Sequence, residues 1–395
     1  MDAVAREICR QSILSTGRTW PNPSVACVIV TDQGVFTGAT EQPGRRHAEI
    51  VALDSMDQTL GDESLRVTGD MYVTLEPCST HGRTPPCVDR IVQYPGLNIH
   101  ISCMDPLLNQ AGVRALQSAG LAVQSVTMPG QEFLHGFISR SSGQGPRFHL
   151  KAATMAGWMG SRKRRVGISG EDGQWIGQLL RAKLDAVVVG PGTIAVDLPG
   201  LNFRSPSITG RLKRVSGEDV WMDSLLDNSA ECIRLANDPV YQPARVFLMG
   251  RPFAGLDAWL AKQAKLEGET SRRSLYFDLT ENKQWSGLGA KPLPALSHPN
   301  FTIALRTELA SCGFNEVLIE GGAGLHNAIA LGLNQHDRVL LIERKHGAED
   351  SWTLADGTQA NSADLDVALP PSLKQARVHA RYSGGTDDLV VANPA

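Results

Sequence analysis

One histidine and two cysteines constrain this chain more than any other feature of its sequence. His47 begins a His-Ala-Glu motif at the start of a predicted helix, Cys78 follows a predicted strand, and Cys87 begins the next predicted helix. Imidazole and thiolate bind zinc tetrahedrally, and three protein ligands leave a fourth position open for water. The fold must therefore bring helix and strand ends together at one edge of a sheet, where α/β folds place their sites.

Glu49 has the right chemistry and position to move protons at such a metal. Bound zinc lowers the pKa of water from near 16 to about 7. In zinc deaminases a glutamate two residues after the ligand histidine shuttles protons, ahead of a Pro-Cys pair, which here is Pro77-Cys78. We predict a catalytic zinc site with His47, Cys78 and Cys87 as ligands and Glu49 as proton shuttle. Ordinary buried cysteines and a core histidine are the alternative, which the full set of motifs disfavours.

The loop from Ser79 to Pro86 sets this pattern apart. Nucleobase and cytidine deaminases usually carry a short Cys-x-x-Cys spacing. The longer loop of this chain can reach over a bound substrate.

Composition limits the class of protein. At 395 residues the chain is long enough for two domains, and 42% apolar content supplies packed cores. A formal net charge of -3 gives no electrostatic case for nucleic acid. Seven cysteines in so long a chain do not form a disulfide framework, which favours the reduced cytoplasm. We expect no signal peptide and no membrane span, since no apolar run approaches about 20 residues.

Alternating apolar runs and amphipathic periods predict a layered α/β domain over residues 1–143. We expect helices over Ala3–Ser15, His47–Ser55, Cys87–Gln93, Val113–Ala119 and Gln131–Ser141, and strands over Ser24–Thr31, Val35–Gly38, Asp70–Leu75, Leu97–Cys103 and Leu121–Val126.

The glycine-rich break from Ser142 to Pro146 predicts a boundary, and a second α/β domain then covers residues 147–395. The polar stretch 205–243 is interpreted as an insertion on its surface. We expect strands over Arg147–Thr154, Asp185–Val189, Ala244–Met249, Ser274–Leu279, Glu316–Ile319, Arg338–Ile342, Val378–Tyr382 and Asp388–Ala392, and helices over Gln174–Lys183, Leu256–Leu266, Ala304–Cys312 and Gly324–Leu331.

Two strands of the second domain end in glycines. Gly190, Gly192 and Thr193 follow one apolar run, and Gly321 and Gly322 follow another. Glycine lets a backbone approach a ligand closely, and amides at a helix start favour phosphate. Neither stretch is the dinucleotide fingerprint, so tight-turn packing explains these glycines equally well.

From about Ala3 to Asn393 the chain resembles the bifunctional riboflavin-biosynthesis deaminase–reductase family. The first domain matches in Thr19-x-Pro-Asn-Pro-Ser-Val25, in His47-Ala-Glu49 and in the run Thr74 to Cys87. The second matches in Phe148-x-Leu-Lys151, Trp175-Ile, Leu180-Arg181-Ala, Gly190-x-Gly-Thr193, Asp197-x-Pro199-x-Leu, Arg204 and Glu320-Gly-Gly322.

The resemblance implies a cytidine-deaminase-like three-layer domain followed by a dihydrofolate-reductase-like domain. The first would use Zn²⁺ to hydrolyse the ring amino group of a diamino-(phosphoribosylamino)pyrimidinone. The second would use NADPH to reduce the ribosyl group to ribityl. The family also implies a homo-oligomer, a dimer or tetramer, with a small-molecule pyrimidine ribotide as its substrate and neither nucleic acid nor membrane as partner.

The resemblance also assigns roles to single residues. In the first domain, Asn22 would contact the pyrimidine and Arg83 the substrate phosphate, with a solvated loop charge as the alternative for Arg83. For His81, a substrate contact and a bond to backbone are equally plausible. In the second domain, Asp197 would be the acid. The other implied substrate contacts are Lys151, Trp175, Arg181, Arg204 and Glu320, and the implied cofactor contacts are Gly190, Gly192, Thr193, Gly321 and Gly322.

Two positions depart from the family pattern in the reductase half. Ala156 replaces a carboxylate, and Leu198 replaces an acidic or amide residue. A working but divergent enzyme and a deaminase with a slow or silent reductase both fit. The basic run Arg162–Arg165 could hold a phosphate of NADPH or substrate, or form a solvated hairpin. Two other classes compete: a nucleoside or nucleobase deaminase with an accessory domain, and a zinc-stabilised binding protein.

Overall fold

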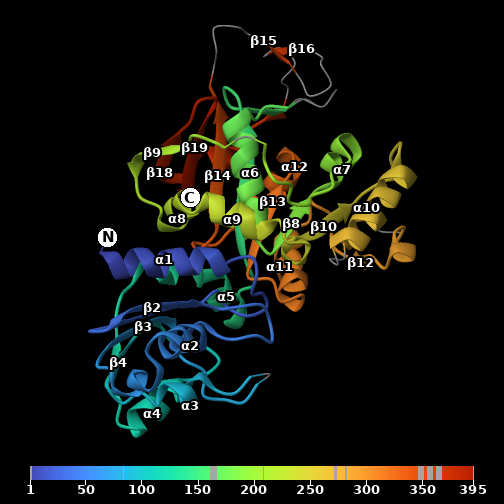
Figure 1. The fold of residues 1–395 in the computed structure, drawn as a ribbon. Coiled ribbons are helices and arrows are strands. Elements are labelled where there is room, and N and C mark those ends of the chain that lie inside the picture. Colours follow the sequence, from blue (N-terminus) through green and yellow to red (C-terminus); the bar gives the residue numbers. More distant parts are fainter. Residues whose placement is uncertain are drawn as a thin grey trace. The chain divides into compact units, whose positions relative to one another are not determined.

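The computed structural model describes residues 2–82, 84–160, 167–207, 209–270, 274–280, 283–345, 351–353, 359–361 and 367–394. The chain forms two compact units (Figure 1). The first contains Met1–Gly145 together with Val220–Cys232, and the second contains Pro146–Asp219 and Ile233–Ala395.

A five-stranded sheet in the order β2-β1-β3-β4-β5 forms the centre of the first unit. Strand β1 pairs antiparallel with β2 and β3, whereas β3, β4 and β5 run parallel. The parallel connections require crossovers, and helices supply them. The strands are β1 Ala26–Thr31, β2 Gly34–Ala39, β3 Gly69–Leu75, β4 Leu97–Cys103 and β5 Val123–Ser125.

Helices cover both faces of this sheet, which gives three layers (Figure 1). Alternate residues of β1 show the division: Cys27 and Ile29 pack with α2, α3 and α4, while Val28 packs with Ile8 of α1. The expected three-layer fold is confirmed. The helices are α1 Ala3–Ser15, α2 Ala48–Leu60, α3 Cys87–Ile91, α4 Ala111–Ser118 and α5 His135–Ser141, with 3-10 turns η1 Gly61–Arg66 and η2 Pro129–Phe133.

The stretch 205–243 is not a surface insertion, so that prediction was wrong. It contains β9 Lys213–Gly217 and two helices, α8 Val220–Asp227 and α9 Ser229–Ala236. Trp221 and Leu225 of α8 are buried at helical spacing. Helix α8 packs on α1 within the first unit, and Arg10 binds Glu231 at 2.9 Å. The prediction failed because the stretch has many charged residues, although its apolar residues form a stripe long enough for two turns of helix.

A ten-stranded sheet in the order β12-β11-β10-β8-β13-β6-β14-β19-β18-β9 organises the second unit. In that order, the strands from β12 at the edge through to β14 run parallel to one another. Strands β19, β18 and β9 follow, each antiparallel to its neighbour. The strands are β6 Arg147–Thr154, β8 Ala186–Val189, β10 Ala244–Met249, β11 Ser274–Asp278, β12 Lys291–Pro292, β13 Glu316–Glu320, β14 Arg338–Arg344, β18 Arg377–Ser383 and β19 Asp387–Asn393.

Continuous apolar runs in β8 and β10 are buried along their whole length, as expected for parallel strands covered on both faces. The helices are α6 Glu171–Lys183, α7 Pro191–Asp197, α10 Leu256–Thr270, α11 Phe301–Ser311, α12 Ala323–Ala330 and α13 Pro371–Lys374, with 3-10 turns η3 Pro239–Tyr241 and η4 Ser286–Leu288. Two small sheets pair β7 Trp158–Gly160 with β17 Val367–Ala368, and β15 Ser351–Thr353 with β16 Gln359–Asn361.

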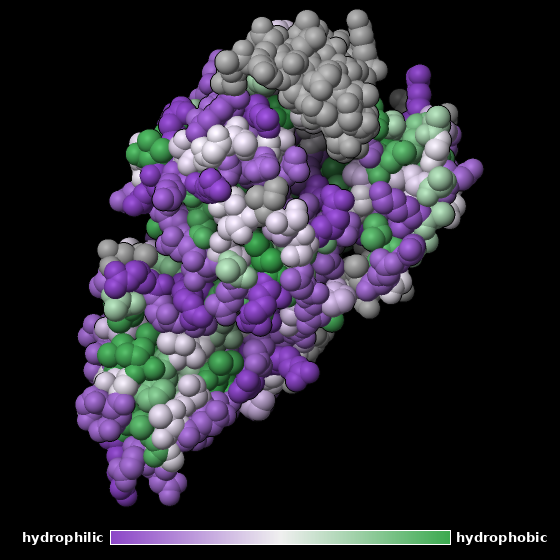
Figure 2. Space-filling model, turned by 45° about the horizontal axis from the view of Figure 1, so that its top comes forward, coloured by the Kyte–Doolittle hydropathy of each residue, from purple (hydrophilic) through white to green (hydrophobic). Residues whose placement is uncertain are grey.

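On the face that Figure 2 shows, hydrophobic residues lie in small groups between hydrophilic ones. Within the described part of the chain, each helix is too short or too polar to cross a bilayer.

Candidate functional site

The predicted metal ligands meet at one end of the first unit's sheet. His47 is the N-cap of α2, Cys87 is the first residue of α3, and Cys78 lies in the loop that follows β3. Their ligand atoms lie within 4.8 Å of one another. His47 Nδ1 is 3.6 Å from Cys78 Sγ and 3.3 Å from Cys87 Sγ. This donor set of one imidazole and two thiolates suits zinc and leaves a coordination position open.

Electrostatics prepare the sulfur atoms for a metal. The hydrogen bond from the Cys87 thiol, helped by His47, lowers the pKa of Cys78 to about 4. The same bond, together with burial and Glu49, raises the pKa of Cys87. The Cys87 N–H also donates to Cys78 Sγ at 3.2 Å. Zinc binds cysteine as the thiolate, so metal binding releases the thiol protons that the two sulfur atoms carry.

Glu49 stands beside the ligands in the first turn of α2 and is only 3% exposed. Burial raises the pKa of Glu49, partly offset by His47. A carboxyl group with a raised pKa can both accept and return a proton near neutral pH. Its position and its titration fit the predicted shuttle.

The other predicted residues of the first unit lie in loops. Asn22 is half-buried in the turn before β1, and its N–H donates to the Thr19 carbonyl at 2.8 Å. His81 is exposed in the loop between the two cysteines. Arg83 lies outside the described residues. Their substrate contacts remain predictions.

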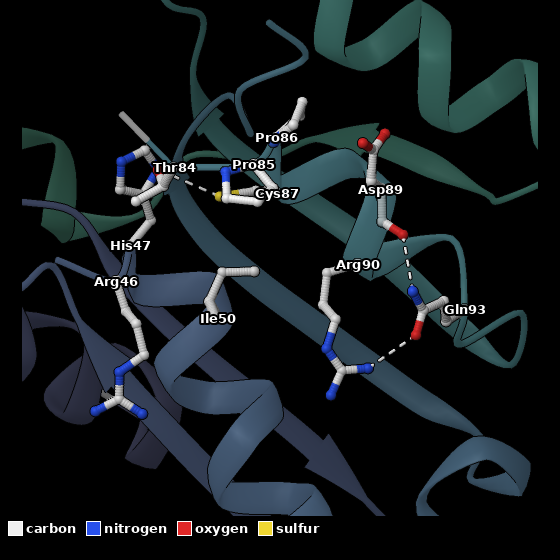
Figure 3. Close-up of a pocket in the computed structure, with 10 residues that line it drawn as sticks. All are labelled: Arg46, His47, Ile50, Thr84, Pro85, Pro86, Cys87, Asp89, Arg90 and Gln93. Carbon is white, nitrogen blue, oxygen red and sulfur yellow. Dashed lines mark hydrogen bonds between the residues drawn. The ribbon is translucent and has the colours of Figure 1, made fainter. Parts of the chain in front are cut away.

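A pocket of about 300 Å³ opens beside the zinc ligands, and sequence reasoning missed it (Figure 3). His47 and Cys87 contribute to its wall, and Ile50 of α2 lies between His47 and Arg90 of α3 in this view. The flanking arginines are neutralised: Arg46 pairs with Glu41 and Asp54, and Arg90 pairs with Asp57. The remaining lining residues are Thr84, Pro85, Pro86, Asp89 and Gln93.

A charged cluster lies at the carboxyl ends of the second unit's central strands. Lys151 of β6 and Glu320 of β13 are register partners. Arg181 of α6 donates two hydrogen bonds to Glu320, at 3.1 and 2.6 Å. Burial lowers the pKa of Lys151, partly offset by Glu320. Burial opposes ionisation of Glu320, but Arg181 and Lys151 outweigh it and lower its pKa.

The predicted cofactor glycines come together beside this cluster, because β8 and β13 are neighbours. A Cβ on Gly190 or Gly321 would lie 3.2 Å from Leu325, so both pack closely there. Gly192 and Gly322 face open space, with no atom within 4 Å of a built Cβ. Thr193 lies in α7, a helix that the sequence analysis missed and that Pro191 begins.

His326 also belongs to this region and was not foreseen. It is fully buried on α12, with Nδ1 3.1 Å from the Gly322 carbonyl and Nε2 3.2 Å from the Lys151 carbonyl. Burial lowers the pKa of His326. The imidazole thus links the strand that carries Lys151 to the Gly-Gly turn. In the sequence, the feature that could have pointed to His326 is its place four residues after Gly322, one helical turn further along the chain.

The remaining predicted residues of the second unit differ in exposure. Asp197 ends α7 and is half-buried, and Arg204 is exposed, with its N–H donating to Gln178 at 2.8 Å. Trp175 is only 4% exposed, and Gly210 packs on its ring. Trp175 therefore packs as a buried side chain, and its contact with the substrate remains a prediction. The run 162–165 lies outside the described residues.

Comparisons with known proteins agree with this geometry. The profile described as the cytidine and deoxycytidylate deaminase zinc-binding region matches residues 4–101. The riboflavin biosynthesis protein RibD of Chlamydia trachomatis serovar D is 30% identical over 329 residues, covering 78% of this chain and 75% of that protein. RibD of Chlamydia muridarum is 36% identical over 198 residues, covering 47% of this chain and 51% of that protein. The chain thus matches about half the length of some RibD relatives.

The fold is shared with a solved two-domain enzyme. The Thermotoga maritima protein named diaminohydroxyphosphoribosylaminopyrimidine deaminase/5-amino-6-(5-phosphoribosylamino)uracil reductase superposes with a TM-score of 0.67. The match covers 99% of each chain at 23% sequence identity. This likeness shows that the α/β fold of the chain is shared with that protein.

Proposed function

The chain belongs to the RibD family of riboflavin biosynthesis proteins, and from this premise we propose that it catalyses two consecutive steps. The first is hydrolytic deamination of 2,5-diamino-6-(5-phosphoribosylamino)pyrimidin-4(3H)-one, with release of ammonia. The second is NADPH-dependent reduction of the ribosyl side chain to ribityl. The observation that carries the proposal is the set of three ligand atoms within 4.8 Å beside the buried carboxyl group of Glu49.

In the deamination, His47, Cys78 and Cys87 would hold the metal, and zinc bound there would supply an acidified water as nucleophile. Glu49 takes a proton from that water and delivers protons to the ring nitrogen and the departing amine. Its raised pKa suits both directions of transfer. Asn22 orients the pyrimidine by its amide, and the loop between the two cysteines is long enough to reach over the substrate.

In the reduction, NADPH supplies the hydride, and the chain positions the sugar and moves a proton. Gly192 and Gly322 leave space for the cofactor to approach the protein backbone, since no atom lies within 4 Å of a Cβ built on either glycine. Arg181 fixes Glu320, and Glu320 lies beside Lys151 at the sugar. Asp197 at the end of α7 protonates the opened sugar.

A coupled assay on zinc-loaded protein tests both steps. With the diamino substrate, ammonia release followed by loss of NADPH absorbance is the expected result. Ammonia without NADPH loss would instead support the second candidate, a deaminase with a slow or silent reductase. If the zinc-loaded protein gave no ammonia and no loss of NADPH absorbance, the proposed function would be wrong.

The assembly and the location of the protein form a separate proposal. We infer a dimer or tetramer in the reducing cytoplasm, because all seven cysteines are free and the family implies an oligomer. Light scattering during size-exclusion chromatography checks the first point. A monomer over a range of concentrations would contradict it.

A further inference from the structure

The buried carboxylate of Glu76 connects the zinc ligand Cys78 to a different part of the first unit. Glu76 directly follows β3, is 3% exposed, and donates its N–H to the Cys103 carbonyl of β4 at 2.9 Å. Its Oε1 accepts the N–H of Gly112 at 2.9 Å and that of Val113 at 3.4 Å. Its Oε2 accepts the N–H of Asp105 at 3.3 Å. One side chain therefore joins β3, the loop after β4 and the first turn of α4.

The first turn of α4, which Glu76 binds, also lies against the peptide that precedes Cys78. A Cβ on Gly112 would lie 2.1 Å from the Pro77 carbonyl oxygen and 3.2 Å from Glu76. Helix α4 thus rests directly on the Pro77 carbonyl, at a distance that only glycine permits. On its other side, Cys78 is held by α3, where Val88 donates to its carbonyl at 3.2 Å.

The loop that Glu76 holds has an unfavourable backbone. Asn109 and Gln110 both have positive φ, at 46° and 60°, immediately before α4. Successive left-handed residues other than glycine persist only where surrounding contacts hold them. The carboxylate provides such contacts on both sides of the pair, at Asp105 and at Gly112.

We propose that Glu76 is a positioning residue for zinc, which acts by fixing the backbone that presents Cys78 to the metal. The inference rests on the proposed zinc site and adds a residue to it. Glu76 is not itself a ligand, because backbone amides occupy both of its oxygens. Supports of this outer kind hold ligands in place, and their loss typically costs about 10–100-fold in metal affinity.

Three variants of the full chain test the proposal. Glu76→Ala removes all three contacts, whereas Glu76→Gln keeps the Oε1 contacts and presents an amide to the Asp105 N–H. Zinc affinity, measured by competition with a chromogenic chelator, is expected to fall by about 10–100-fold for Glu76→Ala and by less for Glu76→Gln. Gly112→Ala strains the contact between α4 and the Pro77 carbonyl without altering the Glu76 carboxylate, and it should also weaken zinc binding. Glu63→Gln, at an exposed ion pair with Arg66, is the matched control and should leave zinc affinity unchanged.

The deaminase assay supplies a readout that a general loss of stability would not move. Activity of the Glu76 variants should recover in excess zinc, whereas Glu49→Gln should stay inactive at every zinc concentration. If all three test variants bind zinc as the wild type does, with only a lower melting temperature, Glu76 is a helix cap and the proposal is wrong. If Glu76→Ala does not fold, Glu76→Gln and Gly112→Ala decide by the same measurements. Failure of the wild type to bind zinc would instead refute the proposed function.

Discussion

The zinc site of the first unit and the charged cluster of the second unit are built in opposite ways. The first depends on three side chains whose chemistry few other residues can replace, placed at the starts of α2 and α3 and after β3. The second combines the paired Arg181 and Glu320 with glycines that follow β8 and β13 and with a backbone carbonyl of β6. A site defined by ligand chemistry can be read from residue types, while a site built of backbone depends on which strand ends become neighbours.

The largest effect is expected from Cys78→Ala. Loss of one of three ligands should reduce bound zinc from about one equivalent to almost none, because two ligands hold zinc poorly. Deamination should then disappear, while NADPH oxidation with the deaminated intermediate should continue. Metal analysis and the two separate assays check this. Loss of both activities would show that the second unit also depends on the metal site.

Glu49→Gln should separate metal binding from proton transfer. The variant keeps the ligands but lacks the acid, so deamination should fall by about 10²–10⁴-fold with zinc content unchanged. Steady-state ammonia release and metal analysis on one sample provide the measurement. Retained deamination would remove Glu49 from its assigned role.

In the second unit, Arg181→Met should cost stability as well as reduction. Glu320 would lose both hydrogen bonds from Arg181 while keeping the nearby charge of Lys151, a loss of about 3 kcal/mol in the free energy of unfolding. Urea unfolding measures this, and Arg181→Met combined with Glu320→Gln should recover part of the loss. An unchanged unfolding midpoint for the single variant would show that the pair is not a structural part of the cluster.

Acid should weaken the same pair with a definite sign. The pKa of Glu320 is lowered in the folded chain, so its contribution is complete above its unfolded value of about 4.3 and is lost as pH falls through the folded value. In urea unfolding measured at a series of acid pH values, the midpoint should fall less steeply with decreasing pH for Glu320→Gln than for the wild type.

The smallest effect concerns Asp172, in the first turn of the helix that carries Arg181. Burial opposes its ionisation, but the N–H groups of Thr386 and Arg211 donate to it at 2.8 and 2.7 Å and lower its pKa. Its contribution is present above about pH 3.9 and disappears as pH falls through the lower folded value. Asp172→Asn should lose about 1 kcal/mol at neutral pH and little in acid. A loss that is equal at both pH values would exclude the charge as the cause.

Sequence analysis identified elements best where one signal dominated. Helix Ala3–Ser15 and strand Leu97–Cys103 have the predicted bounds, since each has a regular apolar pattern between clear breaks. Helix α7 was missed because Gly190-Pro-Gly192 is typical of a turn, although Pro191 in fact begins a helix. Helix α8 was missed because its buried face is short and its surroundings are charged.

The sequence by itself determined the zinc chemistry, since thiolates, imidazole and a nearby carboxylate restrict both the metal and the reaction. It also determined two α/β units, because apolar periodicity is a local property. Only the tertiary structure decided that α8 packs with the first unit, that Arg181 binds Glu320, and that Glu76 accepts the N–H of Gly112. These are contacts between segments far apart in the chain, and side-chain type alone does not reveal which of many possible partners the fold brings within a hydrogen bond.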